Sequence, residues 1–162
     1  MNLEVKIECK NNDGFEFLSV ESWNDHYLMR LNDYLFEHRN RIPRVLGLLS
    51  DPNETEYGGN LIYMYMQGSV VFIYDSTYNR DEQVEFGIGI NRADLIKIMK
   101  AWLEVNELGV VRGGIKEMVL QRDEEHINMI VHYEDGSEFK RTFNYKCNEE
   151  ELKALKDYYF EE

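Results

Sequence analysis

The sequence predicts an α+β domain, a largely antiparallel β-sheet of about 7–8 strands with three main helices packed on it. Several short segments alternate apolar and polar residues, as half-buried strands do. Glycine, asparagine and aspartate mark the connections between them, which favours antiparallel hairpins. Three longer segments repeat apolar residues every three or four positions, which is typical of amphipathic helices.

The first 50 residues predict a hairpin followed by two helices. Residues 3–10 alternate, a polar turn follows at 11–14, and residues 15–20 form the return strand. Ser22 is the expected start of a helix whose apolar positions recur at helical spacing. Pro43 suits the first turn of a short second helix that ends near residue 49.

The central segment predicts three consecutive strands. Residues 61–66 and 70–74 are apolar on both faces, which indicates buried central strands. Residues 84–90 alternate, so we expect a third strand there. Its glycines, Gly87 and Gly89, leave a flat surface that a helix or a backbone can approach closely, or they mark a bulge.

Asparagine is the expected N-cap of both remaining helices. Asn91 precedes an apolar stripe that extends to Val105, and Asn148 precedes Glu149, Glu150 and Glu151, whose charge favours the positive end of a helix. Between these helices we expect three more strands, at residues 115–122, 127–133 and 139–145.

Length and composition favour one domain over residues 1–162. The chain has 162 residues, 43% of them hydrophobic, and a domain of that size buries about 70% of its unfolded surface without a disulfide or a metal. The two cysteines, Cys9 and Cys147, lie far apart and are expected to be reduced. The N-terminus has no apolar signal segment, and no run suits a membrane-spanning helix. We therefore expect a cytoplasmic protein.

The charge of the chain indicates what it binds. The net charge is −13, from 31 acidic and 18 basic side chains, and acids exceed bases in every third of the chain. Such a field repels nucleic acid and anionic membranes and favours a basic protein partner. The other interpretation is that the acidity serves solubility alone.

Motifs for catalysis or metal binding are missing from the sequence. The histidines His26, His38, His126 and His132 have no spacing that would direct two imidazoles at one ion. Cys147 stands at a helix start, where the pKa of a thiol can fall, but no partner base is identifiable. We expect no enzyme activity, no metal and no cofactor.

Two acidic connections between predicted strands form the candidate recognition surface. They place carboxylates beside tyrosine, which combines steering of a basic partner with an anchoring aromatic ring. The predicted partner-binding residues are Asp75, Tyr78, Asp81, Glu82, Glu85, Asp123, Glu124 and Glu125.

The chain resembles, in overall character, the cytoplasmic immunity proteins of bacterial toxin systems such as contact-dependent growth inhibition. The resemblance lies in the apolar run at 61–74, the acidic connection at 75–85 and the helix at 91–105, and it assigns no single residue a role. It implies a small acidic α+β protein that binds and blocks a toxin nuclease domain.

Three hypotheses for function follow. The first is an immunity or inhibitor protein that occludes a basic toxin domain through an acidic surface, with an on-rate that falls as salt rises. The second is a non-catalytic interaction domain, with a homo-oligomer left open, whose association is insensitive to salt. The third is a small enzyme with a site that the sequence does not reveal.

Overall fold

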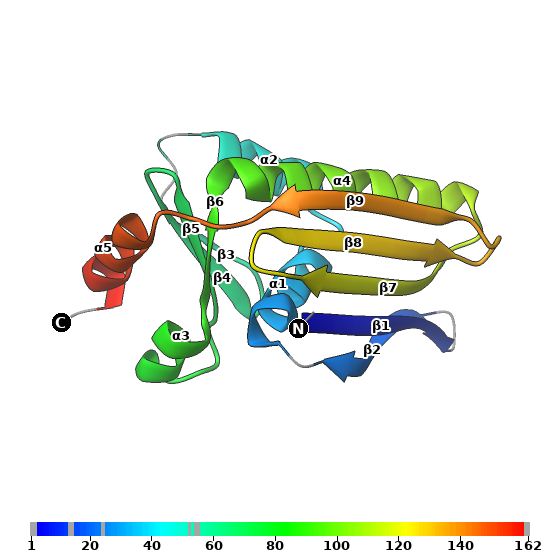
Figure 1. Ribbon diagram of the computed structural model, residues 1–162, viewed down its shortest axis with the longest axis horizontal. Helices are drawn as coiled ribbons and strands as arrows, with labels where there is room; N and C mark the ends of the chain where they lie inside the picture. The colour runs from blue at the N-terminus through cyan, green and yellow to red at the C-terminus, as the bar shows by residue number, and fades with distance from the viewer. Residues whose placement is uncertain (1–2, 13–14, 24, 52, 54–55, 161–162) are drawn as a thin grey trace.

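The fold consists of two antiparallel β-sheets and the helices that cover them (Figure 1). The computed structural model describes residues 3–12, 15–23, 25–51, 53 and 56–160. The larger sheet has five strands in the order β2-β1-β7-β8-β9. They are β1 (Leu3–Asn12), β2 (Phe15–Trp23), β7 (Ile115–Arg122), β8 (His126–Tyr133) and β9 (Glu138–Asn144).

The smaller sheet has four strands in the order β3-β4-β5-β6. All of its neighbours pair antiparallel, so the predicted α+β class with antiparallel sheet is confirmed. Its strands are β3 (Glu56–Gly58), β4 (Ile62–Gln67), β5 (Val70–Asp75) and β6 (Ile88–Asn91).

One helix packs against both sheets. Helix α1 packs on strands of both sheets, and its buried side chains belong to a core that both sheets share. Helix α4 runs along the larger sheet beside β9 and contacts α2 (Figure 1). The helices are α1 (His26–Glu37), α2 (Ile42–Ser50), α3 (Arg80–Phe86), α4 (Arg92–Val111) and α5 (Glu149–Phe160).

Residues in the larger sheet alternate between a buried and a partly exposed face. In β8, Ile127, Met129 and Val131 are buried, while the residues between them remain partly exposed. This is the pattern expected where helices cover one face of a sheet and solvent reaches the other. The alternation read from the sequence of this segment is therefore confirmed.

Strand β5 is buried on both faces, as the sequence predicted. Helix α1 covers one face of the smaller sheet, and α5 packs on β4 and β5 in a second apolar cluster. Gly89 makes this packing possible, because a Cβ at that position would lie 2.6 Å from a methyl carbon of Leu152 in α5. The close approach of a helix to this glycine is thus confirmed.

Two of the expected elements are wrong. Ser22 does not begin a helix, because it pairs with Lys6 in the hairpin, and Asp25 instead caps α1 by accepting from the Tyr27 N–H. The strand expected at residues 84–90 is wrong in its first half, because residues 84–86 end helix α3 and Gly87 caps it, whereas residues 88–90 belong to β6 as expected. The predicted turn at Asp13 and Gly14 lies outside the described residues.

Candidate functional site

A helical excursion separates two strands that pair directly. Strands β5 and β6 are antiparallel neighbours, yet residues 76–87 and helix α3 lie between them. Helix α3 buries none of its side chains. Asn79 caps it by accepting from the Glu82 N–H at 2.9 Å, and the Gln83 amide donates to the Tyr78 carbonyl at 2.8 Å. The excursion adds no buried side chain to the core, and connections of this kind often carry function.

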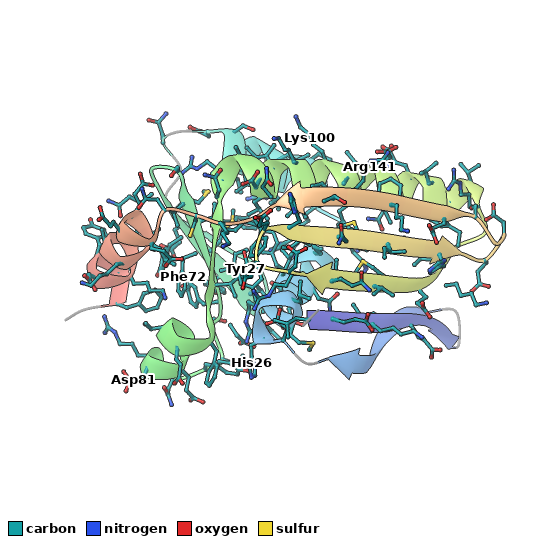
Figure 2. The ribbon with its side chains drawn as sticks, in the orientation of Figure 1. His26, Tyr27, Phe72, Asp81, Lys100 and Arg141 are labelled. Carbon is teal, nitrogen blue, oxygen red and sulfur yellow. The ribbon has the colours of Figure 1, made fainter. Side chains whose placement is uncertain are left out.

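The outer side of the excursion is acidic, with two exposed apolar side chains beside it. Asp81 and Glu85 are exposed, and Figure 2 shows Asp81 at the outer end of α3. Tyr78 is 38% exposed and Leu61 is 46% exposed. The Ser76 N–H donates to the Leu61 carbonyl at 2.8 Å, so Leu61 adjoins the turn that leads to Tyr78. We define the acidic patch as Leu61, Asp75, Tyr78, Asp81, Glu82 and Glu85.

A buried arginine supports the patch from below. Arg30 of α1 is 6% exposed, and its Nη1 donates to Asp33 Oδ2 at 3.1 Å and to Asp75 Oδ2 at 3.4 Å. Its guanidinium carbon lies 5.2 Å from the centre of the Tyr78 ring, a cation–π distance. Arg30 thereby links α1, β5 and the base of the excursion.

Asp75 is engaged within the fold more than its neighbours in the patch. Its Oδ1 accepts from the Thr77 N–H at 2.8 Å and from the Thr77 hydroxyl at 2.6 Å, while Oδ2 faces Arg30. Its side chain is 16% exposed. Asp75 therefore positions the turn, and the freely accessible carboxylates of the patch lie on α3.

The second acidic connection, between β7 and β8, is also at the surface. Asp123, Glu124 and Glu125 are all exposed. Asp123 Oδ1 accepts from the N–H groups of Glu125 and His126 at 2.8 Å, and these hydrogen bonds lower the pKa of the Asp123 carboxyl. Asp123 thus shapes the turn, which leaves Glu124 and Glu125 to face solvent.

Both acidic connections adjoin the first turn of α1. Arg122, at the end of β7, forms an ion pair with Asp25, the N-cap of α1. On the other side, the His26 ring lies 5.4 Å from the ring of Phe86 in α3. No hydrogen bond or ion pair is seen between the two connections among the residues described. The eight predicted residues therefore form two groups near one helix end.

Three residues in or next to the acidic patch were not predicted as site residues. Leu61 begins a segment expected to be a buried strand, and no sequence pattern singled out Arg30 or Asp33. Only tertiary structure brings these residues beside the excursion. The i,i+3 spacing of Arg30 and Asp33 is a recognisable ion-pair signal, but it does not reveal the contact with Asp75.

Burial perturbs the pKa values of Cys147 and His38. Burial and the nearby Glu149 carboxylate raise the pKa of Cys147, which disfavours a nucleophilic thiolate. His38 is fully buried, and burial lowers its pKa to about 4. No three His, Cys, Asp or Glu side chains among the described residues are grouped to hold a metal ion.

Three surface hollows lie elsewhere among the described residues. Their volumes are about 490, 410 and 560 Å³, and the described residues that line them include no carboxylate, cysteine or histidine.

Comparison with known proteins gives no relative. No protein-family model, no curated protein and no solved structure matches this chain. Within the described residues, no helix has both the length and the apolar character needed to cross a membrane.

Proposed function

We propose that the protein is a non-catalytic inhibitor of the immunity type, which binds and occludes the basic domain of a nuclease toxin. The observation that supports this role is the α3 excursion, which adds carboxylates and Tyr78 to the surface and no buried side chain to the core. The role places the protein in the cytoplasm, where it would meet the toxin.

The patch has the composition of a protein-binding site. Exposed Tyr78 and Leu61 offer apolar anchors, and Asp81, Glu82 and Glu85 add negative charge on the adjoining helix α3. Aromatic anchors contribute strongly to binding energy, and charges around them accelerate encounter with an oppositely charged partner. The carboxylates would form ion pairs with the Lys and Arg side chains that bind phosphates in a nuclease.

The supporting contacts below the patch favour a preformed surface. Arg30 fixes Asp75 and lies against Tyr78, and Gln83 ties α3 to its own turn. A surface that is ordered before binding loses less conformational entropy when the partner arrives. We therefore propose binding with little rearrangement of the excursion.

The test is capture of the partner followed by an activity assay. The tagged full-length protein is incubated with lysate of the source cell at about 50 mM and about 500 mM salt, because screening over this range weakens steering by surface charge. We expect one stoichiometric basic protein, captured more slowly at high salt, whose nuclease activity disappears at equimolar inhibitor. Unchanged activity of the fully bound partner would contradict the inhibitor role.

A second candidate function is association between copies of the chain. Val110 and Val111, at the end of α4, are 87% and 82% exposed, and adjacent exposed apolar side chains suit a protein contact. This association would be insensitive to salt. Capture of the chain itself, and of no basic protein, would favour it over the inhibitor role.

A further inference from the structure

The ion-pair cluster below the patch contains a carboxylate that also reaches the surface. The side chain of Asp33 is 37% exposed, whereas that of Arg30, its partner at 3.1 Å, is 7% exposed. Arg30 Nη1 also lies 3.4 Å from Asp75 Oδ2. Asp33 therefore shares its ionic partner with Asp75, a residue of the acidic patch. The ion pairs of Arg30 thus connect Asp75, at the base of the excursion, with a partly exposed carboxylate on α1.

We propose that Asp33 extends the partner-binding surface onto α1 and that its protonation weakens the binding of a basic partner as the pH falls from 7 to 5. This inference rests on the proposed function, because it assumes that the acidic patch contacts the partner.

The charge balance of the cluster explains why the affinity for a basic partner should fall as the pH falls. With both carboxylates ionised, Asp33 and Asp75 carry two negative charges against the single positive charge of Arg30. Protonation of Asp33 makes the cluster neutral overall. A cationic partner then meets one negative charge fewer, and the buried guanidinium loses an ionic partner.

The surroundings of Asp33 place this protonation close to neutral pH. The pKa of the Asp33 carboxyl is raised to about 6, because burial and the charges of Asp75 and Glu37 together outweigh the opposing charge of Arg30. Glu37 is itself held in place, because its carboxylate accepts from the Leu61 and Ile62 N–H groups. Binding of a cation next to Asp33 lowers its pKa, so by linkage it releases a proton near pH 6.

A histidine also lies beside the excursion. His26 is exposed, and its ring contacts Phe86 of α3 at 5.4 Å between centres. The variant His26→Gln therefore serves as the matched control for Asp33→Asn.

The first arm of the test uses the free protein and needs no partner. The side-chain carboxyl carbons are followed by NMR from pH 8 to pH 3 in the wild type and in His26→Gln. We expect the Asp33 signal to titrate with a midpoint near 6 in both proteins. A midpoint near 4, the ordinary value for aspartate, would overturn the inference while leaving the proposed function intact.

The second arm adds a hexa-arginine peptide as a defined basic probe. We expect perturbed signals at Asp33, Asp81 and Glu85, a lower Asp33 midpoint, and a loss of affinity between pH 7 and pH 5 about threefold greater in the wild type than in Asp33→Asn. His26→Gln should retain that extra loss.

The outcomes of the second arm separate the two claims. Perturbation of Asp81 and Glu85 without Asp33 would overturn the extension onto α1 alone. An equal loss of affinity in the wild type and in Asp33→Asn would overturn the pH dependence assigned to Asp33. No perturbation anywhere on α3 would contradict the acidic patch itself, and with it the proposed function.

Discussion

Replacing Trp102 by alanine should lower the free energy of unfolding by about 4 kcal/mol, the cost of deleting a fully buried large aromatic side chain. Trp102 of α4 is 0% exposed and packs edge-on against Phe36 of α1, with 5.0 Å between the ring centres. Its indole N–H donates to the Leu35 carbonyl at 3.0 Å. The substitution therefore removes the contact that fixes α4 against the helix carrying Arg30 and Asp33.

Chemical denaturation monitored by circular dichroism measures this effect. Lys100→Ala is the control, because Lys100 is exposed on the same helix (Figure 2) and should change stability by less than about 0.5 kcal/mol. A loss below about 1 kcal/mol for Trp102→Ala would show that α1 and α4 do not pack as described.

Acidification from pH 7 to pH 4 should cost the fold about 3 kcal/mol through His38 alone. Burial, together with the charge of Arg41, lowers the pKa of His38 in the folded protein to about 4, below the value of about 6.5 in an unfolded chain. As the pH falls through this window, the unfolded chain binds a proton that the folded protein does not. Stability therefore decreases as the pH falls.

The structure explains why His38 resists protonation. Its ring is 0% exposed and lies against the rings of Tyr34 and Tyr57, at 4.7 and 5.4 Å between centres. Neither ring nitrogen has a hydrogen-bond partner among the residues described. The Glu37 carboxylate lies 3.7 Å from Nε2, but burial is the largest influence on His38 and disfavours a positive charge there.

Urea denaturation at several pH values tests this prediction. The stability difference between the wild type and His38→Phe should change by about 3 kcal/mol from pH 7 to pH 4, because only the wild type carries the buried imidazole. His132→Gln, which alters a partly exposed histidine paired with Glu138, should follow the wild type. Parallel curves for the wild type and His38→Phe would contradict the account.

Local signals in the sequence predicted much of the fold. Asn91 and Asn148 were identified as N-caps, and both side chains accept from N–H groups in the first turns of α4 and α5. The alternation at 127–133 and the two-sided apolar run at 70–74 gave β8 and β5 correctly. In each case a property of neighbouring residues determines the structure.

The errors arose where a local pattern competed with a second signal, either another local pattern or the pairing of strands. Residues 84–90 alternate as a strand does, but Asn79 caps a helix that Asp81 and Glu82 stabilise at its positive end, and this helix continues to Phe86. Ser22 is a good N-cap residue, yet pairing of β2 with β1 extends past it. Tertiary pairing decided the second case, and cap chemistry decided the first.

The candidate site could be predicted only in part. Its charges are visible in the sequence because Asp81, Glu82 and Glu85 lie close together in the chain. The contact between Arg30 and Asp75 joins residues 45 positions apart, and no local pattern predicts it. The support below the patch, which explains how the surface is held, required the structure.

The central claim is that the carboxylates of α3 attract a basic partner. The most direct measurement is the association rate constant of the captured partner with the wild type and two double variants. Asp81→Asn with Glu85→Gln removes two exposed charges of the patch. Glu107→Gln with Glu134→Gln removes two exposed charges, one in the last part of α4 and one in the β8–β9 connection, and these segments lie at the end of the molecule opposite α3 (Figure 1).

At about 50 mM salt, we expect the α3 variant to associate about tenfold more slowly than the wild type, and the control variant to match the wild type. The difference should largely vanish at about 500 mM salt, where the charges are screened. Equal rates for the two double variants would show that net charge, and not the acidic patch, governs the encounter.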